Sequence, residues 1–171
     1  EGDHIPEIFQ RLNREGENPQ PYQLFMSQLM SYWPHLENEP INPREEIRDW
    51  VQMFKTDYPE YEQYIDRKLF VRYSAYLINY DLLHSSIKEL SKDDMDELHD
   101  RWTHTEGPRN ITGYDWFKKS LEKAFETIIG SGIRYKVMNT MPLFPLLGVF
   151  YYENPRANVQ ENVNEVFYFI S

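Results

Sequence analysis

The chain has 171 residues and no cysteine, and its 28 Asp and Glu against 18 Lys and Arg leave a formal net charge of −10 at pH 7. Without cysteine it cannot form a disulfide, a thiolate nucleophile, a Cys-ligated zinc site or an iron–sulfur cluster. The negative charge disfavours binding to nucleic acid and to anionic membranes, because both interactions depend on exposed Lys and Arg.

Length and hydropathy predict one domain without a membrane span. The length fits a single globular domain over residues 1–171, since domains commonly run to about 100–200 residues. The longest apolar stretch, Pro142 to Tyr152, contains two prolines and is too short to cross a bilayer. The N-terminus has neither an initiator Met nor a signal-peptide pattern, so we expect a piece of a longer intracellular protein, from the cytoplasm or the nucleus.

Residues 3–130 predict about six helices. The clearest helix start is Asn42-Pro43-Arg44-Glu45, which places a capping Asn before a Pro at the first helical position and a Glu three residues after the cap. Elsewhere apolar residues recur at the three- and four-residue spacing of a core-facing helix, with breaks at Gly and Pro. This spacing predicts helices over residues 3–12, 22–33, 43–54, 69–90, 91–102 and 114–129.

The pattern changes after Gly132. Residues 133–137 alternate apolar and charged side chains, as a half-buried strand does, and short β-branched and aromatic runs follow at 146–152 and 166–170. The economical interpretation is a small antiparallel sheet over residues 133–170 that packs on the helices. The sequence therefore predicts an α+β fold.

Motifs for nucleotide binding and for serine hydrolysis are missing from the sequence. The seven glycines form neither G-x-G-x-x-G nor a Walker pattern, and there is no G-x-S-x-G. We therefore expect no nucleotide and no other cofactor, and the sequence favours an interaction module over an enzyme.

A metal-dependent enzyme or metal-binding protein is the first alternative. In a helix, Asp96 and His99 at i and i+3, or Asp96 and Asp100 at i and i+4, could share a face and offer carboxylate and imidazole ligands to a divalent metal. The competing interpretation is an acidic, solvated helix face. Further ligands in this segment would be His104 and Glu106.

Aromatic residues make up 16% of the chain, and we predict that some of them bind a partner. The tyrosines of the 69–90 stripe indicate either a core helix or an interface, since tyrosine is common in both. The C-terminal runs are apolar on both alternating faces, so their second face needs a cover: other helices, another protein or a second copy. The predicted partner-binding residues are Tyr73, Tyr76, Tyr80, Tyr151, Tyr152, Phe167, Tyr168 and Phe169.

An acidic decoy for a basic partner is the second alternative. Residues 37–66 could present a negative surface, although a solvated helical surface explains the same composition. The leading interpretation is a non-enzymatic interaction, scaffold or regulatory module that binds another protein or itself. The nine acids of the decoy alternative are Glu37, Glu39, Glu45, Glu46, Asp49, Asp57, Glu60, Glu62 and Asp66.

Overall fold

The computed structural model describes residues 21–32, 43–78, 91–103, 111, 113–132 and 143–163, and every regular element in these ranges is helical. A short helical turn at residues 159–163 follows the last long helix. The elements are α2 (Pro21–Tyr32), α3 (Pro43–Asp57), the 3₁₀ helix η2 (Pro59–Tyr64), α4 (Arg67–Ile78), α5 (Lys92–Thr103), α6 (Gly113–Gly130) and α7 (Leu143–Glu153).

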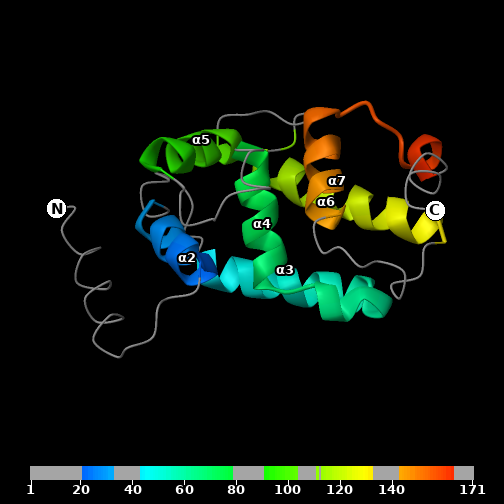
Figure 1. The fold of residues 1–171 in the computed structure, drawn as a ribbon, viewed down its shortest axis with the longest axis horizontal. Coiled ribbons are helices and arrows are strands. Elements are labelled where there is room, and N and C mark those ends of the chain that lie inside the picture. The colour runs from blue at the N-terminus through cyan, green and yellow to red at the C-terminus, as the bar shows by residue number, and fades with distance from the viewer. Residues whose placement is uncertain are drawn as a thin grey trace.

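Helices α4 and α7 pack against each other at the centre of the described structure. In Figure 1 they cross α3 and α6, which run along the long axis of the molecule, while α5 lies above α4. α7 makes its most extensive contacts with α6, and α5 packs on α6, α4 and α2. Among the described elements, α6 is therefore the main packing partner of α7 and also packs against α5.

The core consists largely of aromatic rings arranged around two residues of α6. The Phe117 ring stacks on Tyr73 of α4 with centroids 4.2 Å apart, and the edge of Trp102 from α5 meets it at 5.3 Å. About two turns further along, the Phe125 ring stacks on Phe144 of α7 at 4.1 Å. Both α6 rings are fully buried, so they join four helices into one apolar cluster.

Local capping explains where α4 and α5 begin. The Asp66 carboxylate accepts a hydrogen bond from the Leu69 amide at 2.9 Å. Before α5, the Asp94 carboxylate accepts from the Ser91 amide at 2.6 Å, and the Ser91 hydroxyl accepts from the Asp94 amide at 3.2 Å. These bonds satisfy amides that have no partner inside the helix.

The predicted sheet, and with it the α+β fold, is wrong for the described residues. Residues 146–152 belong to α7, whereas the predicted strands at 133–137 and 166–170 lie outside the described residues. A short apolar run suits a buried helix as well as a buried strand. Here one helical face carries Phe144, Gly148, Tyr151 and Tyr152, which are all buried. In a helix these residues lie on the side that packs against α4 and α6.

Most of the predicted helices are confirmed where the structure describes them. The bounds of α2, α3, α5 and α6 agree with the predicted segments to within about three residues, as expected for helix ends. The predicted 69–90 helix is described only as far as Ile78, and the predicted 3–12 helix lies outside the described residues. Within the described ranges, no helix is both long and apolar enough to cross a membrane.

Candidate functional site

Four of the tyrosines predicted to bind a partner lie in the core. Tyr73 and Tyr151 are fully buried, while Tyr152 and Tyr76 are 6% and 8% exposed. A partner could contact these side chains only if α4 or α7 moved. The other predicted residues, Tyr80, Phe167, Tyr168 and Phe169, lie outside the described residues.

The buried hydroxyl groups join helices to one another or close turns within them. Tyr73 donates to the Phe117 carbonyl at 3.1 Å, and burial raises its pKa well above the ordinary value. Ser74, Ser120 and Thr127 each donate to the carbonyl four residues earlier in their helix. These hydroxyls satisfy polar groups inside the core, and their geometry is that of helix back-bonding.

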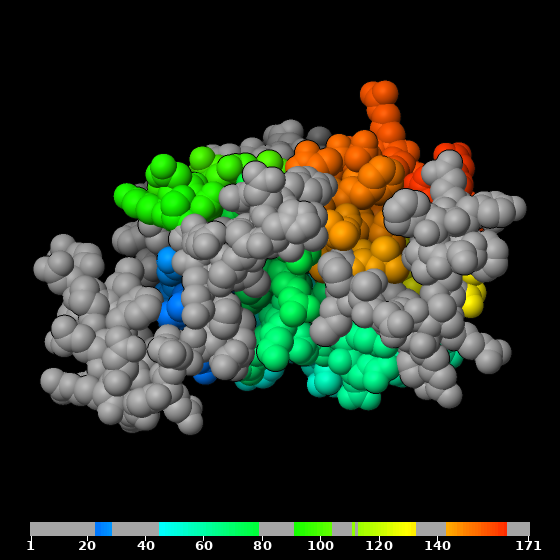
Figure 2. Space-filling view, viewed as in Figure 1, coloured from blue at the N-terminus to red at the C-terminus, as the bar shows by residue number. Residues whose placement is uncertain are grey.

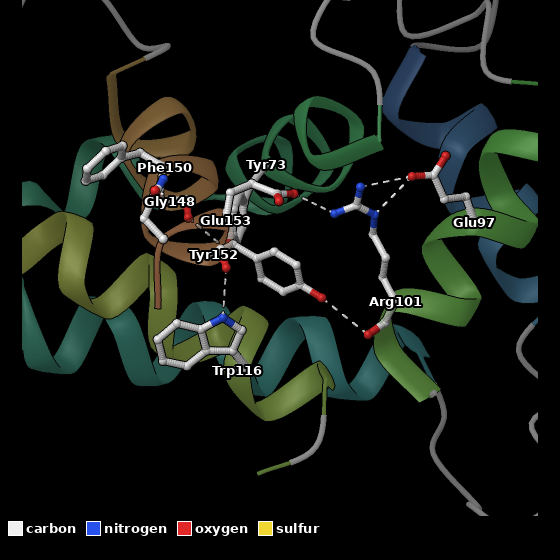
Figure 3. A network of polar contacts seen from close by, with 9 residues as sticks. Tyr73, Glu97, Arg101, Trp116, Gly148, Phe150, Tyr152 and Glu153 are labelled. Carbon is white, nitrogen blue, oxygen red and sulfur yellow. Dashed lines mark hydrogen bonds and ion pairs between the residues drawn. The ribbon is translucent and has the colours of Figure 1, made fainter. Parts of the chain in front are cut away.

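A polar junction connects the C-terminal ends of α5 and α7 (Figure 3). Arg101 contacts Glu153 of α7 at 2.6 Å and Glu97 of its own helix at 3.0 Å. Tyr152 donates to the Arg101 carbonyl at 3.3 Å, and its own carbonyl accepts from the Trp116 indole at 3.1 Å. Arg101 therefore bridges the two helices through the carboxylates of Glu97 and Glu153.

Burial and hydrogen bonding together set the charge states of Arg101 and Tyr152 in this junction. Burial lowers the pKa of Arg101, but hydrogen bonds to Glu153 and Glu97 outweigh this effect and leave the pKa above its ordinary value. Burial also raises the pKa of Tyr152 to about 12, an effect that the Arg101 charge opposes. Arg101 is thus charged and Tyr152 neutral at physiological pH, which suits a structural junction.

Asp96 and Asp100 of the metal alternative are exposed on α5, whereas His99 is partly buried. Asp96 is exposed, and His99 Nδ1 lies 3.7 Å from Asp100 Oδ1, with Asp100 largely exposed. Among the described residues, no three His, Asp or Glu side chains come together in a way that could hold a metal ion. His104 and Glu106 lie outside the described residues.

The acids of the decoy alternative do not form a uniform negative face. Glu62 lies 3.5 Å from Lys55, and Glu46 lies 3.5 Å from Lys118 of α6. Asp49 pairs with Arg48 at 2.9 Å, and the Asp66 carboxylate caps α4. The exposed acids that complete the described set are Glu45, Asp57 and Glu60, whereas Glu37 and Glu39 lie outside it.

The outer face of α5 is an acidic surface. Asp93, Asp96, Glu97 and Asp100 are exposed, and their spacing places them along one side of the helix. Lys92 is exposed at the start of the helix, and Arg101 pairs with both Glu97 of this face and Glu153 of α7. The helix lies along the upper left edge of the molecule in Figure 2.

No known family matches the chain, and neither the curated proteins nor the solved structures include one that is significantly similar to it. The functional interpretation therefore depends on the geometry described above.

Sequence reasoning identified the acidic residues of α5 but missed the orientation of its arginine. The Arg101 and Glu153 side chains meet across 52 positions of the chain, and Thr127 meets Tyr151 across 24. No local pattern reports such pairs, because they depend on how α5, α6 and α7 pack. The Glu97 and Arg101 pair at i and i+4 was the one local signal available.

Proposed function

We propose that this chain is a non-enzymatic interaction module that binds a basic protein partner through the outer face of α5. The observation that carries the proposal is the distribution of charge on this helix. Asp93, Asp96 and Asp100 are directed to solvent, whereas Arg101 turns toward Glu153 of α7. Asp93, Asp96 and Asp100 therefore give the exposed side of α5 a negative charge.

The arrangement favours electrostatic recognition over catalysis. Carboxylates along one side of a helix attract and orient a Lys- or Arg-rich segment, which raises the rate of association. The buried hydroxyls of Ser74, Ser120, Thr127 and Tyr151 are engaged in helix back-bonding or in a bond between helices. We place the module inside the cell, in the cytoplasm or the nucleus, because a chain without cysteine lacks the disulfides on which many small secreted domains depend.

The test compares two triple variants that remove the same charge. One carries Asp93→Asn, Asp96→Asn and Asp100→Asn on α5, and its control carries Glu45→Gln, Asp49→Asn and Asp57→Asn on α3. Fluorescence anisotropy with a labelled oligolysine peptide measures binding at low and at physiological ionic strength. We expect the α5 variant to weaken binding several-fold more than the control does, and salt to weaken binding to the unaltered chain.

Two outcomes would overturn the proposal. Equal weakening by both triple variants would show that the peptide responds to net charge and not to α5. Binding that is unchanged between the two ionic strengths would show that the recognition is not electrostatic. Circular dichroism of both variants ensures that the comparison is made between folded proteins.

A further inference from the structure

After α7 ends at Glu153, the chain turns back and follows α6. The Asn154 side chain donates to the Phe150 carbonyl at 2.9 Å, which closes the end of α7. Residues 155–156 form a turn, and the Asn158 carboxamide oxygen accepts from the Gln160 amide at 3.0 Å before the helical turn at 159–163. We call residues 154–163 the strap, and Figure 1 shows it running from α7 to the far end of α6.

Beyond Asn154, the strap packs the partly buried side chains of Ala157 and Val159 against the core and meets α6 and α7 at further points. Lys123 of α6 donates to the Ala157 carbonyl at 3.2 Å, and the Asn162 amide donates to the Tyr151 hydroxyl at 3.3 Å. At its end, a Val163 methyl lies 3.0 Å from where a Cβ of Gly130 would be, so the glycine permits this close approach.

Lys123 contributes the only charge among these contacts. Its ammonium group lies 5.1 Å from the centroid of the Trp116 ring and 5.5 Å from that of the Tyr151 ring. Both distances are within the range of a cation–π interaction. A single cation therefore links α6, α7 and the strap.

The Tyr151 hydroxyl of α7 bonds to both the strap and α6. Thr127 donates to the Lys123 carbonyl at 2.8 Å, and its hydroxyl oxygen is 2.6 Å from the Tyr151 hydroxyl. Tyr151 therefore donates to Thr127 and accepts from Asn162, which completes a chain of hydrogen bonds from the strap to α6. Opening the strap would remove the Asn162 bond.

We propose that residues 154–163 act as a conformational strap whose closure over α6 depends on the positive charge of Lys123. Much of the strap faces solvent: Asn154, Pro155, Arg156, Asn158, Gln160 and Glu161 are exposed. Because most of its residues are exposed, this segment opens at a lower free energy than the core unfolds. The strap is thus a switchable element, and it is separate from the proposed binding face on α5.

Trypsin provides a local probe, because its target bond between Arg156 and Ala157 adjoins the carbonyl that Lys123 holds. The test variant is Lys123→Met, which keeps an unbranched side chain but loses the charge. Lys119→Met is the matched control, since Lys119 pairs with Glu122 on the surface at 2.9 Å. Mass spectrometry follows the cleavage at Arg156 and, as an internal reference for the core, the cleavage at Arg48.

We expect Lys123→Met to accelerate cleavage at Arg156 by on the order of ten-fold, because it removes a charge-assisted hydrogen bond and a cation–π interaction. Cleavage at Arg48 should change much less. Lys123→Arg keeps the charge and should stay close to the unaltered rate, as should Lys119→Met.

Three results would overturn the proposal. Unchanged cleavage at Arg156 in Lys123→Met would show that the lysine does not hold the strap. Equal acceleration at Arg156 and Arg48 would show that the strap does not open separately from the core. Acceleration in Lys123→Arg as large as in Lys123→Met would show that charge is not the determinant.

Discussion

Helices α5 and α7 have nearly the same length, 12 and 11 residues, yet they are stabilised in opposite ways. α5 buries one stripe of three side chains and carries a capping pair at its start. α7 buries six residues and carries a single charged side chain, Glu153. A helix that buries only one stripe, such as α5, therefore relies on its cap, whereas a central helix such as α7 can form through packing alone.

The largest expected effect comes from opening a cavity beneath α7. Phe144→Ala should lower the free energy of unfolding by about 3–5 kcal/mol, because the ring is buried and stacks on Phe125 with centroids 4.1 Å apart. Phe150→Ala on the same helix is the control and should cost much less, since Phe150 is 40% exposed. Urea denaturation measures both, and similar losses would mean that α7 is not packed as described.

A smaller loss is expected from adding one methyl group to α7. The Cβ of Gly148→Ala would lie 2.8 Å from a ring carbon of Tyr73, whose hydroxyl is held by the Phe117 carbonyl. We expect overpacking to lower the free energy of unfolding by about 1–3 kcal/mol, although alanine is the better helix former by about 1 kcal/mol.

Gly130→Ala is the matched control for this substitution. Its Cβ would lie 3.0 Å from a methyl of Val163 in the strap and not against a ring of the core, so we expect a smaller loss than for Gly148→Ala. Chemical denaturation of both variants provides the comparison. A stabilising Gly148→Ala would show that α4 and α7 are further apart than described.

The cap of α5 should contribute about 1 kcal/mol. Ser91→Ala removes the hydroxyl that accepts from the Asp94 amide, so this amide loses its capping hydrogen bond. Ser91→Gly should cost only a few tenths of a kcal/mol, because glycine leaves the helix end open to water. Thermal unfolding followed by circular dichroism measures both, and an unchanged stability in Ser91→Ala would mean that the hydroxyl bond does not stabilise α5.

The smallest effect concerns the ion pair that connects the two helices. A double-mutant cycle with Arg101→Met and Glu153→Gln should yield a coupling energy of about 0.2–1 kcal/mol, because both side chains are partly exposed to solvent. High salt should reduce this coupling. A coupling energy well above this range would show that the junction is better shielded from water than its exposure indicates.

The sequence was sufficient to predict the helices that carry a local signal. The Asn42-Pro43 start and the apolar stripe of Ile47, Trp50 and Phe54 predicted α3, whose stripe is buried. The acidic face of α5 was visible in the same way, above Met95 and Leu98. In each case, residues three or four positions apart provide both the pattern and the structure, so no distant contact is needed.

The sequence by itself thus determined which segments carry an amphipathic helical pattern, where α3 begins, and that cysteine chemistry is absent. Only the tertiary structure decided that residues 146–152 form a helix, that Tyr73 and Tyr151 are buried, and that Arg101 turns toward Glu153. The physical reason is that these features depend on contacts between residues far apart in the chain. An apolar run becomes a helix or a strand according to what it packs against, and here it packs against α4 and α6.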